Sequence, residues 1–385
     1  MKPRSFFLAL IATVLIFLGL TGWGMAIALA RSPLPLAKGG VDRVPVTAAL
    51  IPGQSPIMVS LLVNPDRLEA FTQLAVNPNR RRRSHQELQD LEQSLLAKTG
   101  LDYRREVKPW LGEEVSLAVT DLDYDQDPSN GAQPGYLLVV HSKDLELSRE
   151  FLQLSYSTAA IAGNADLVFD QYQGVKITYK RPLRPVGNGN LLASAVVGNY
   201  VIFANHPQVL RQSLNSLQAP SLSLTQQSSY QSALASLTTP RLGLFYANFP
   251  ALSAWLSQQS RPENGAIDQT LTVALSLQAQ GLVARTAFTG LHSQSFQSSA
   301  ENSPSLDLVP LPVDSGLVIT GENLAQQWQQ LATGLASQSP LQQSLSQWVK
   351  DWQTPLGLDL ANDIFTWVQD TYQLILIPQD ACPRQ

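Results

Sequence analysis

Residues 100–119 read GLDYRREVKPWLGEEVSLAV, and residues 357–376 read GLDLANDIFTWVQDTYQLIL. Each residue of the second stretch stands 257 positions after its match, so a Gly-Leu-Asp triplet, an acidic–aliphatic pair and a Trp–aliphatic pair recur in register. At the same offset Phe71 matches Trp328. Matches that stay in register over some 60 residues predict an internal repeat of a strand–helix–helix–strand unit. The alternative is a coincidence between two amphipathic patterns.

The first copy of this unit has its own start and stop signals. Residues 57–63 form an apolar run typical of a strand, and Asn64-Pro65-Asp66 predicts the start of a helix. Ser84 and Glu87 form a capping box that predicts a second helix, and residues 115–120 read as the closing strand. We therefore expect a first repeat unit at 48–125 and a last one at 306–378, separated from the middle by a polar linker at 293–305.

The middle region, residues 126–292, alternates hairpins with helices. Gln173-Gly174 and Gly198-Asn199 separate paired apolar runs, as tight β-turns do. Strands joined in this way, with helices between them, predict an α+β fold with a largely antiparallel sheet and packed helices. Because two repeat units rarely bury their apolar faces alone, we expect the first and last units to share one core.

The N-terminal region predicts a membrane anchor. Residues 6–30 hold 25 residues without a charge, which is long enough to span the hydrocarbon core, and Lys2 and Arg4 precede them. We read residues 1–30 as an uncleaved transmembrane signal anchor and 31–47 as a Pro/Gly tether, with the rest exported. The competing interpretation is a signal peptide cleaved after Ala30, since Ala28-Leu29-Ala30 resembles a cleavage site.

Composition excludes several classes of protein. The chain of 385 residues is 44% hydrophobic but only 15% charged, and its formal net charge is −4. The balance gives no bulk positive field for nucleic acid, so we expect no such partner. The single cysteine, Cys382, excludes an intramolecular disulfide, a cysteine-based zinc site and a redox pair.

The sequence contains no recognisable catalytic motif. It lacks a nucleophile elbow, a phosphate-binding loop and a zinc-protease signature, and its histidines stand far apart. We therefore predict no catalytic residues, no metal site and no cofactor, and we expect a protein that is not an enzyme. Groups that converge only in space would escape such a search.

Two charge patterns are the candidate contact sites for a partner or for lipid. An alternating acidic run would present its carboxylates on one side if extended, which could suit calcium, although it fails the EF-hand template. A run of four arginines just before a predicted helix opposes the helix dipole. The alternative for both runs is a solvated loop. The candidate residues are Arg80, Arg81, Arg82, Arg83, Asp121, Asp123, Asp125 and Asp127.

The tryptophans are predicted to be core residues. Trp110 and Trp367 occupy matched repeat positions just before a strand, as core anchors do. Trp328, Trp348 and Trp352 stand at helical spacing, which favours the core as well. The alternative is an apolar ligand groove between helices.

Several stretches of the exported part resemble a known family. They are SLLVNPDRLE (60–69), LDYRREVKPWLGEEVSLAVTDLDYD (101–125), GYLLV (135–139), REFLQLSYSTAAIAG (149–163) and DQYQGVKI (170–177). The chain is similar to a domain-of-unknown-function family of single-pass membrane proteins common in cyanobacteria. The resemblance implies a plasma or thylakoid membrane and a domain in the periplasm or lumen, but no reaction and no catalytic residues.

These features favour a membrane-anchored, non-catalytic binding or assembly protein with a membrane, periplasmic or lumenal protein partner. The alternative is a carrier of an apolar ligand such as a lipid, quinone or pigment. An enzyme with a dispersed site is the third hypothesis.

Overall fold

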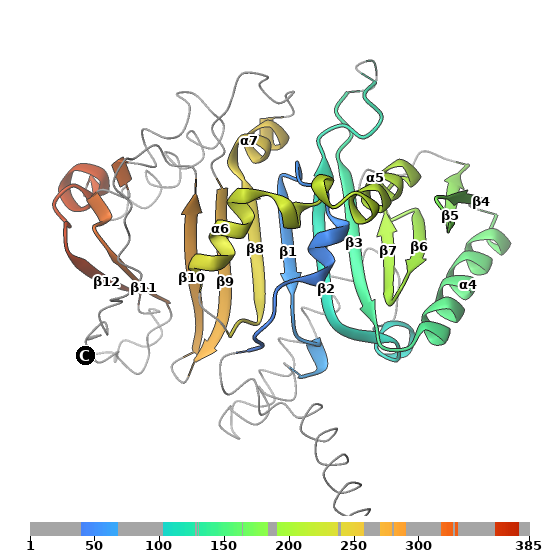
Figure 1. Ribbon diagram of the computed structural model, residues 1–385, viewed down its shortest axis with the longest axis horizontal. Coiled ribbons are helices and arrows are strands. Elements are labelled where there is room, and N and C mark those ends of the chain that lie inside the picture. Colours follow the sequence, from blue (N-terminus) through green and yellow to red (C-terminus); the bar gives the residue numbers. More distant parts are fainter. Residues whose placement is uncertain are drawn as a thin grey trace, which may run out of the picture. The chain divides into compact units, whose positions relative to one another are not determined.

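The computed structural model describes the chain in segments (Figure 1). The described residues are 40–67, 103–127, 129, 131–163, 165–183, 191–237, 240–257, 270–278, 281–289, 317–325, 328–329 and 359–376. They divide into two compact units. One carries a ten-stranded sheet, and the other carries helical segments and a two-stranded sheet.

The ten-stranded sheet has the order β10-β9-β8-β1-β2-β3-β7-β6-β5-β4. Its strands are β1 (Ile57–Leu61), β2 (Leu111–Asp121), β3 (Gly135–Ser142), β4 (Ala165–Tyr172), β5 (Val175–Pro182), β6 (Ala193–Val197), β7 (Tyr200–Ala204), β8 (Gly243–Asn248), β9 (Thr270–Gln278) and β10 (Gly281–Thr289). Neighbouring strands run antiparallel, and β1 lies between β2 and β8, with Val59 opposite both Leu117 and Phe245.

One face of this sheet is covered by helices (Figure 1). The helices are η2 (Val46–Leu50), α5 (Pro207–Gln218), η4 (Pro220–Leu222), η5 (Leu224–Gln226) and α6 (Ser228–Ser236). Leu210 and Leu214 of α5 and Tyr230 of α6 share a buried cluster with Leu137 and Val139 of β3. This cluster is the main core, and we call its side of the sheet the helix face.

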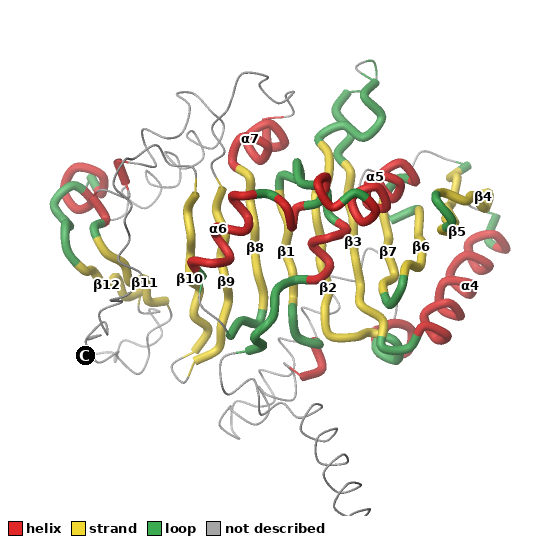
Figure 2. Tube along the Cα trace, in the orientation of Figure 1, coloured by secondary structure: helices red, strands yellow, loops and turns green. Residues whose placement is uncertain are grey.

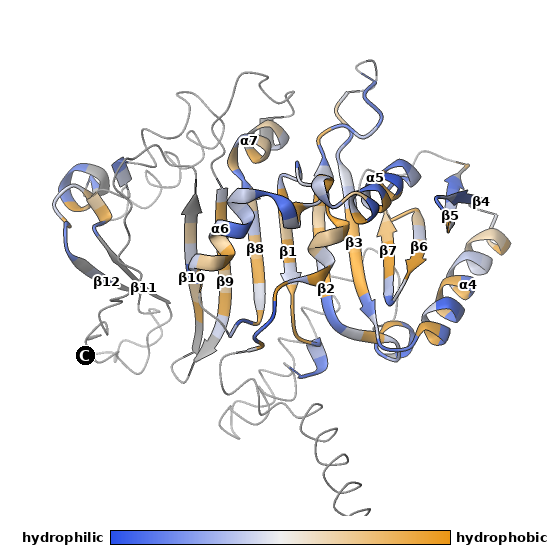
Figure 3. Cartoon of the chain, in the orientation of Figure 1, coloured by the Kyte–Doolittle hydropathy of each residue, from blue (hydrophilic) through white to orange (hydrophobic). Residues whose placement is uncertain are grey.

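A second, smaller core lies on the opposite face. Helix α4 (Leu145–Ile161) contributes Phe151 and Leu152, which cluster with Trp110, Val140 and Val201. Successive strand residues point to opposite faces, so β3 supplies Val139 to one core and Val140 to the other. Figure 3 shows the apolar residues along β3, β7 and β6, where the sheet is packed on both faces.

The hairpin turns follow the predicted residues. Gln173 and Gly174 both have positive φ, at 50° and 81°, and join β4 to β5. Gly198, at φ 53°, turns between β6 and β7. These short turns confirm the predicted hairpins, since two-residue turns of this hand match the twist of the strands they join.

The second unit contains α7 (Phe249–Ser257), β11 (Leu317–Glu322), the π-helical turn η6 (Leu360–Phe365) and β12 (Thr371–Leu376). Strands β11 and β12 pair antiparallel, with Leu317 opposite Leu376. A matching π-helical turn, η3 (Tyr103–Val107), precedes β2 in the first unit.

The described part of the chain confirms an α+β fold with an antiparallel sheet and packed helices. Among the described helices, none is long and apolar enough to cross a membrane. Residues 65–67 are helical directly after Asn64, as predicted, and Asn64 Oδ1 accepts the Asp66 N–H at 2.9 Å. The predicted anchor (1–30), the rest of that helix, the second predicted helix and the linker (293–305) lie outside the described residues. The expected domain boundaries and the shared core therefore stay predictions.

Candidate functional site

The acidic run forms the loop between β2 and β3, which projects beyond the end of the sheet (Figure 2). Its carboxylates accept hydrogen bonds from the loop's own backbone. The Asp123 N–H donates to Asp121 Oδ1 at 3.3 Å, and the Asp127 N–H donates to Asp125 Oδ1 at 3.2 Å. Ser129 donates to Asp127 Oδ1 through its N–H, at 2.9 Å, and its hydroxyl, at 2.6 Å. Asx-turns of this kind fold the loop locally.

The turned loop does not have the extended form that would align its carboxylates on one side. Burial and a hydrogen bond with Asp125 raise the pKa of Asp123, whereas two hydrogen bonds from Ser129 lower the pKa of Asp127. Within the described residues, no three acidic, histidine or cysteine side chains are placed to hold a metal ion.

The base of the loop is fastened to α5. The rings of Tyr124 and His206 stack at 4.4 Å, and His206 caps α5 by accepting the Gln208 N–H at Nδ1, 3.3 Å away. Gln212 Nε2 donates to Asp121 Oδ2 at 3.1 Å. Burial lowers the pKa of His206. This histidine therefore has a structural role. The arginine run Arg80–Arg83 lies outside the described residues.

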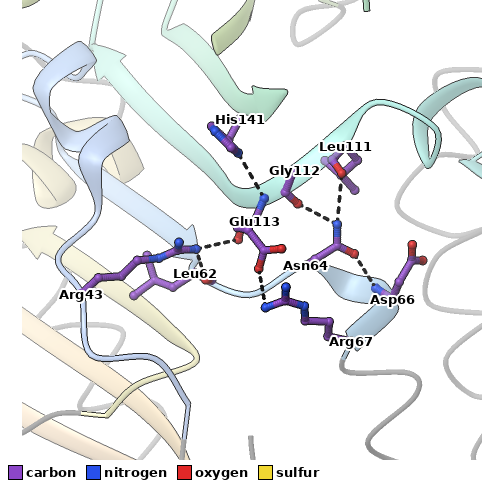
Figure 4. A network of polar contacts seen from close by, with 9 residues as sticks. All are labelled: Arg43, Leu62, Asn64, Asp66, Arg67, Leu111, Gly112, Glu113 and His141. Atoms are coloured by element: carbon purple, nitrogen blue, oxygen red, sulfur yellow. Dashed lines mark hydrogen bonds and ion pairs between the residues drawn. The ribbon is translucent and has the colours of Figure 1, made fainter. Parts of the chain in front are cut away.

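A polar network closes the opposite end of β1 and β2 (Figure 4). The β2–β3 register shifts between Leu111 and Val115, which leaves backbone carbonyls of β2 to be satisfied by side chains. Asn64 Nδ2 donates to the carbonyls of Leu111, at 3.1 Å, and Gly112, at 2.7 Å. Arg43 donates to the carbonyl of Glu113 at 3.2 Å and also to that of Leu62. The network thus supplies the partners that the bulge removes.

Two ion pairs lie in or beside this network. Arg67 lies 3.0 Å from the Glu113 carboxylate, and Lys108 lies 3.0 Å from Asp66. The ring of His141 packs so closely against Gly112 that a Cβ there would lie 2.1 Å from its Nδ1, and this nitrogen accepts the Glu113 N–H. The arrangement is a brace for the bulge, and its side chains are occupied with one another.

A buried polar chain runs along the helix face beside this brace. Glu114, only 3% exposed, accepts the Thr47 N–H at 2.9 Å and the Thr47 hydroxyl at 2.6 Å, at the start of η2. Thr47 Oγ1 lies 2.5 Å from Ser116 Oγ, which lies 2.5 Å from Ser60 Oγ. Hydrogen bonding lets these polar groups stay buried. The helix face of β1 and β2 is therefore partly polar.

The opposite face of the same strands is apolar and half open. Val59 is 46% exposed and Leu117 is 50% exposed, although they stand directly opposite each other. Strand β9 shows the same inversion. Thr272 and Ser276 are buried, whereas Leu271, Val273 and Leu275 on the other side of the strand are half-buried. We call this surface the open face. It comprises Val59, Leu117, Phe245, Leu271, Val273 and Leu275.

The chain matches the sequence profile of a family described as "Protein of unknown function (DUF3352)" over residues 10–385. It belongs to this family. The family match confirms the resemblance to a family of unknown function, and it carries no information on a membrane or a source organism. A search of curated proteins found no match to this DUF3352 chain.

Two solved structures have a distant likeness to the DUF3352 chain. "Structure of crystal form I of TP0453" has 8% identity and a TM-score of 0.34, and it covers 66% of this chain and 81% of that one. "Structure of crystal form III of TP0453" has 8% identity and a TM-score of 0.30, covering 66% and 82%. A likeness this low says nothing about function.

The sequence located some of these features and missed others. Of the alternating aspartates of this DUF3352 chain, Asp121 ends β2 and the other three lie in the loop after it, while a role in contacting a partner or lipid stays a prediction. The sequence did not predict the open face. The alternation LTVALS at 271–276 agrees with it, because Thr272 and Ser276 are buried and the apolar residues at 271, 273 and 275 point to the other side. The cap formed by His206 was detectable from the proline that comes after it, which is common in the first turn of a helix.

Proposed function

We propose that this DUF3352 protein is a membrane-tethered, exported binding protein without catalytic activity, and that the open face is where its partner binds. The observation that carries the proposal is the inverted polarity of β1 and β2. An antiparallel sheet with one solvated face normally turns its polar residues outward. Here Ser60 and Ser116 are buried while Val59 and Leu117 are exposed.

A contiguous apolar surface of this kind supports a role in binding. Exposed apolar patches on soluble proteins mark sites for protein partners, membranes or apolar ligands. Burying a valine, leucine or phenylalanine completely is worth about 1.5–3 kcal/mol, so a row formed by Val59, Leu117 and Phe245 could anchor a stable contact. The satisfied brace and the turned aspartates offer no comparable surface.

The proposed tether rests on the sequence. Residues 6–30 are long and apolar enough to span a bilayer, and the positive charges before them favour export of the C-terminal residues. The family resemblance adds a cyanobacterial plasma or thylakoid membrane as the proposed location, with the sheet in the periplasm or lumen. The anchor would hold the open face near other proteins of the same membrane.

We also infer that the two units contain copies of one motif. In both, a π-helical turn ends just before a tryptophan, and the indole Nε1 donates to the carbonyl four residues earlier. Trp110 donates to Glu106 at 2.7 Å, and Trp367 donates to Asp363. In both, the strand after the tryptophan pairs antiparallel with an earlier strand, β2 with β1 and β12 with β11. The two π-helical turns begin at Tyr103 and Leu360, 257 positions apart like the two tryptophans, and this shared backbone geometry supports a repeat better than residue matches alone.

The test is capture of the tagged full-length protein from native membranes in mild detergent, with proteins and lipids both identified. Val59→Lys/Leu117→Lys places charges on the open face, and Leu147→Lys/Leu154→Lys is the matched control on exposed positions of α4. Far-UV circular dichroism checks that each variant is folded. We expect a stoichiometric protein partner that the open-face variant loses and the control retains.

Other outcomes separate the alternatives. A defined lipid, quinone or pigment that the open-face variant alone loses would favour the carrier function. A partner retained equally by wild type and by both variants would show that the open face is not the binding surface.

A further inference from the structure

The tryptophan of the second unit is exposed where its counterpart is buried. Trp110 is 2% exposed, whereas Trp367 is 66% exposed, although both indoles make the same hydrogen bond to the π-helical turn before them. The turn therefore fixes the direction of each indole, and something else decides whether the indole is covered. In the first unit that cover is α4, whose Phe151 ring lies 5.4 Å from the Trp110 ring.

The first unit shows how such a cover is built. The turn and the strand after it contribute Val107, Trp110, Leu111 and Val115 to the small core. Helix α4 contributes Phe151, Leu152 and Tyr156 from its buried side, and β3 and β7 add Val140 and Val201. On the side of α4, two aromatic residues and a leucine within two turns of one amphipathic helix cover the indole.

The second unit repeats the positions that the turn and its strand contribute to this core. Counting 257 positions on, Val107 becomes Ile364, Trp110 becomes Trp367, Leu111 becomes Val368 and Val115 becomes Tyr372. All four are apolar or aromatic, and none of them is buried: Trp367 is exposed and the others are half-buried. Each position has kept the character needed to pack against a helix, and a large aromatic group in such a place is a typical anchor for a partner.

We propose that this surface, which we call the Trp367 surface, binds an amphipathic α-helix of a second polypeptide, one that presents an aromatic residue, an adjacent leucine and a second aromatic residue as α4 does. A second copy of this chain does not fit the role, because its Phe151, Leu152 and Tyr156 are already buried against its own Trp110. The surface goes beyond the proposed function, since it rests on the inferred repeat and not on the open face. Helix-in-groove recognition of this type uses anchors on one helix face.

The probe is a synthetic, labelled peptide of residues 144–162, which keeps the Asp144 cap and the buried side of α4. Its binding to the full-length protein in mild detergent is measured by fluorescence anisotropy. We expect saturable binding that weakens at least tenfold in Trp367→Ala, as for loss of a central tryptophan anchor. Leu222→Ala, an exposed apolar position in the other unit, is the matched control and should leave the affinity unchanged.

Two further measurements separate contact from folding. Trp367→Phe keeps an apolar ring but loses the indole hydrogen bond, so it should bind within a few-fold of wild type. A peptide with Phe151, Leu152 and Tyr156 changed to alanine should not bind. Acrylamide should quench a component of the fluorescence that Trp367→Phe removes, which shows that the indole is accessible in the protein alone.

Several results would overturn the proposal. They are the absence of saturable peptide binding, equal affinity of Trp367→Ala and wild type, equal weakening by Trp367→Ala and Trp367→Phe, and an indole that acrylamide does not reach. The last result would mean that the chain itself covers the Trp367 surface. Loss of peptide binding in the open-face variant, with Trp367→Ala unaffected, would assign the peptide to the open face and also reject the proposal.

Discussion

The segment η3–β2 and the segment η6–β12 have the same local structure and different surroundings. Each runs from a π-helical turn through a tryptophan into a strand with an antiparallel partner. Trp110 is buried beneath α4, and Trp367 is exposed. The difference teaches that the sequence of the turn determines the backbone and the direction of the indole, whereas burial depends on an element supplied from elsewhere.

The largest expected effect comes from truncating the two tryptophans. Trp110→Ala removes a fully buried indole and should lower the free energy of unfolding by about 3–5 kcal/mol. Trp367→Ala removes an exposed indole and should cost less than about 1 kcal/mol. Urea unfolding of the full-length protein in mild detergent, followed by far-UV circular dichroism, measures both.

Each variant is the control for the other, because both lose the same side chain and the same type of hydrogen bond. A loss of similar size in the two variants would show that Trp367 is buried in solution, and the contrast between the segments would be wrong.

Features set by neighbouring residues could be predicted from the sequence. Gln173-Gly174 and Gly198-Asn199 form turns between adjacent strands, and the residues that form them stand next to one another. Both tryptophans precede a strand, but their expected role as core anchors is confirmed only for Trp110. For Trp367 that prediction is wrong, because the pattern before a strand does not contain the element that covers it.

Features that depend on distant pairing could not be predicted. Strand β1 lies between β2 and β8, and the residues of β1 and β8 that pair are 182 to 190 positions apart. The helix face of β1 is partly polar because Ser60 is hydrogen-bonded to Ser116, which is hydrogen-bonded to Thr47 beside Glu114. Amphipathic reasoning assigns the apolar side of such a strand to the core, so the open face was hidden. In the acidic loop, local Asx-turns competed with the extended form.

Alkaline pH should remove the stabilising contribution of Tyr156, which helps to cover Trp110. The Tyr156 hydroxyl of α4 donates to the Thr178 carbonyl at 2.9 Å and lies 2.7 Å from Ser194 Oγ, and burial raises its pKa from 10.0 to about 12. Between these values an unfolded chain ionises the tyrosine while the folded chain keeps it protonated. Stability is therefore present below pH 10 and is lost as the pH rises through 12, by up to about 2–3 kcal/mol.

The measurement is the free energy of unfolding of wild type and Tyr156→Phe from pH 9 to pH 12. The variant is less stable at pH 9, because it leaves the Thr178 carbonyl without its donor, but the difference between the two proteins should shrink as the pH rises. A difference that stays constant over this range would show that Tyr156 does not titrate with unfolding.

The smallest expected effect comes from the N-cap of α4. Asp144 Oδ1 accepts the N–H groups of Glu146, at 3.0 Å, and Leu147, at 3.1 Å, so Asp144→Ala should lower the free energy of unfolding by about 1 kcal/mol. Asp144→Asn keeps the acceptor and should lower the free energy of unfolding by only a few tenths of a kcal/mol.

The informative readout is acrylamide quenching, because a frayed α4 should expose Trp110 while Trp367 is unaffected. Variants with Trp110→Phe or Trp367→Phe assign the two signals. Equal changes in both would mean that the cap acts on the whole chain and not on the helix that covers one indole. If only Trp110 responds, the two segments differ solely in their cover, and this is the difference that an added helix at Trp367 would remove.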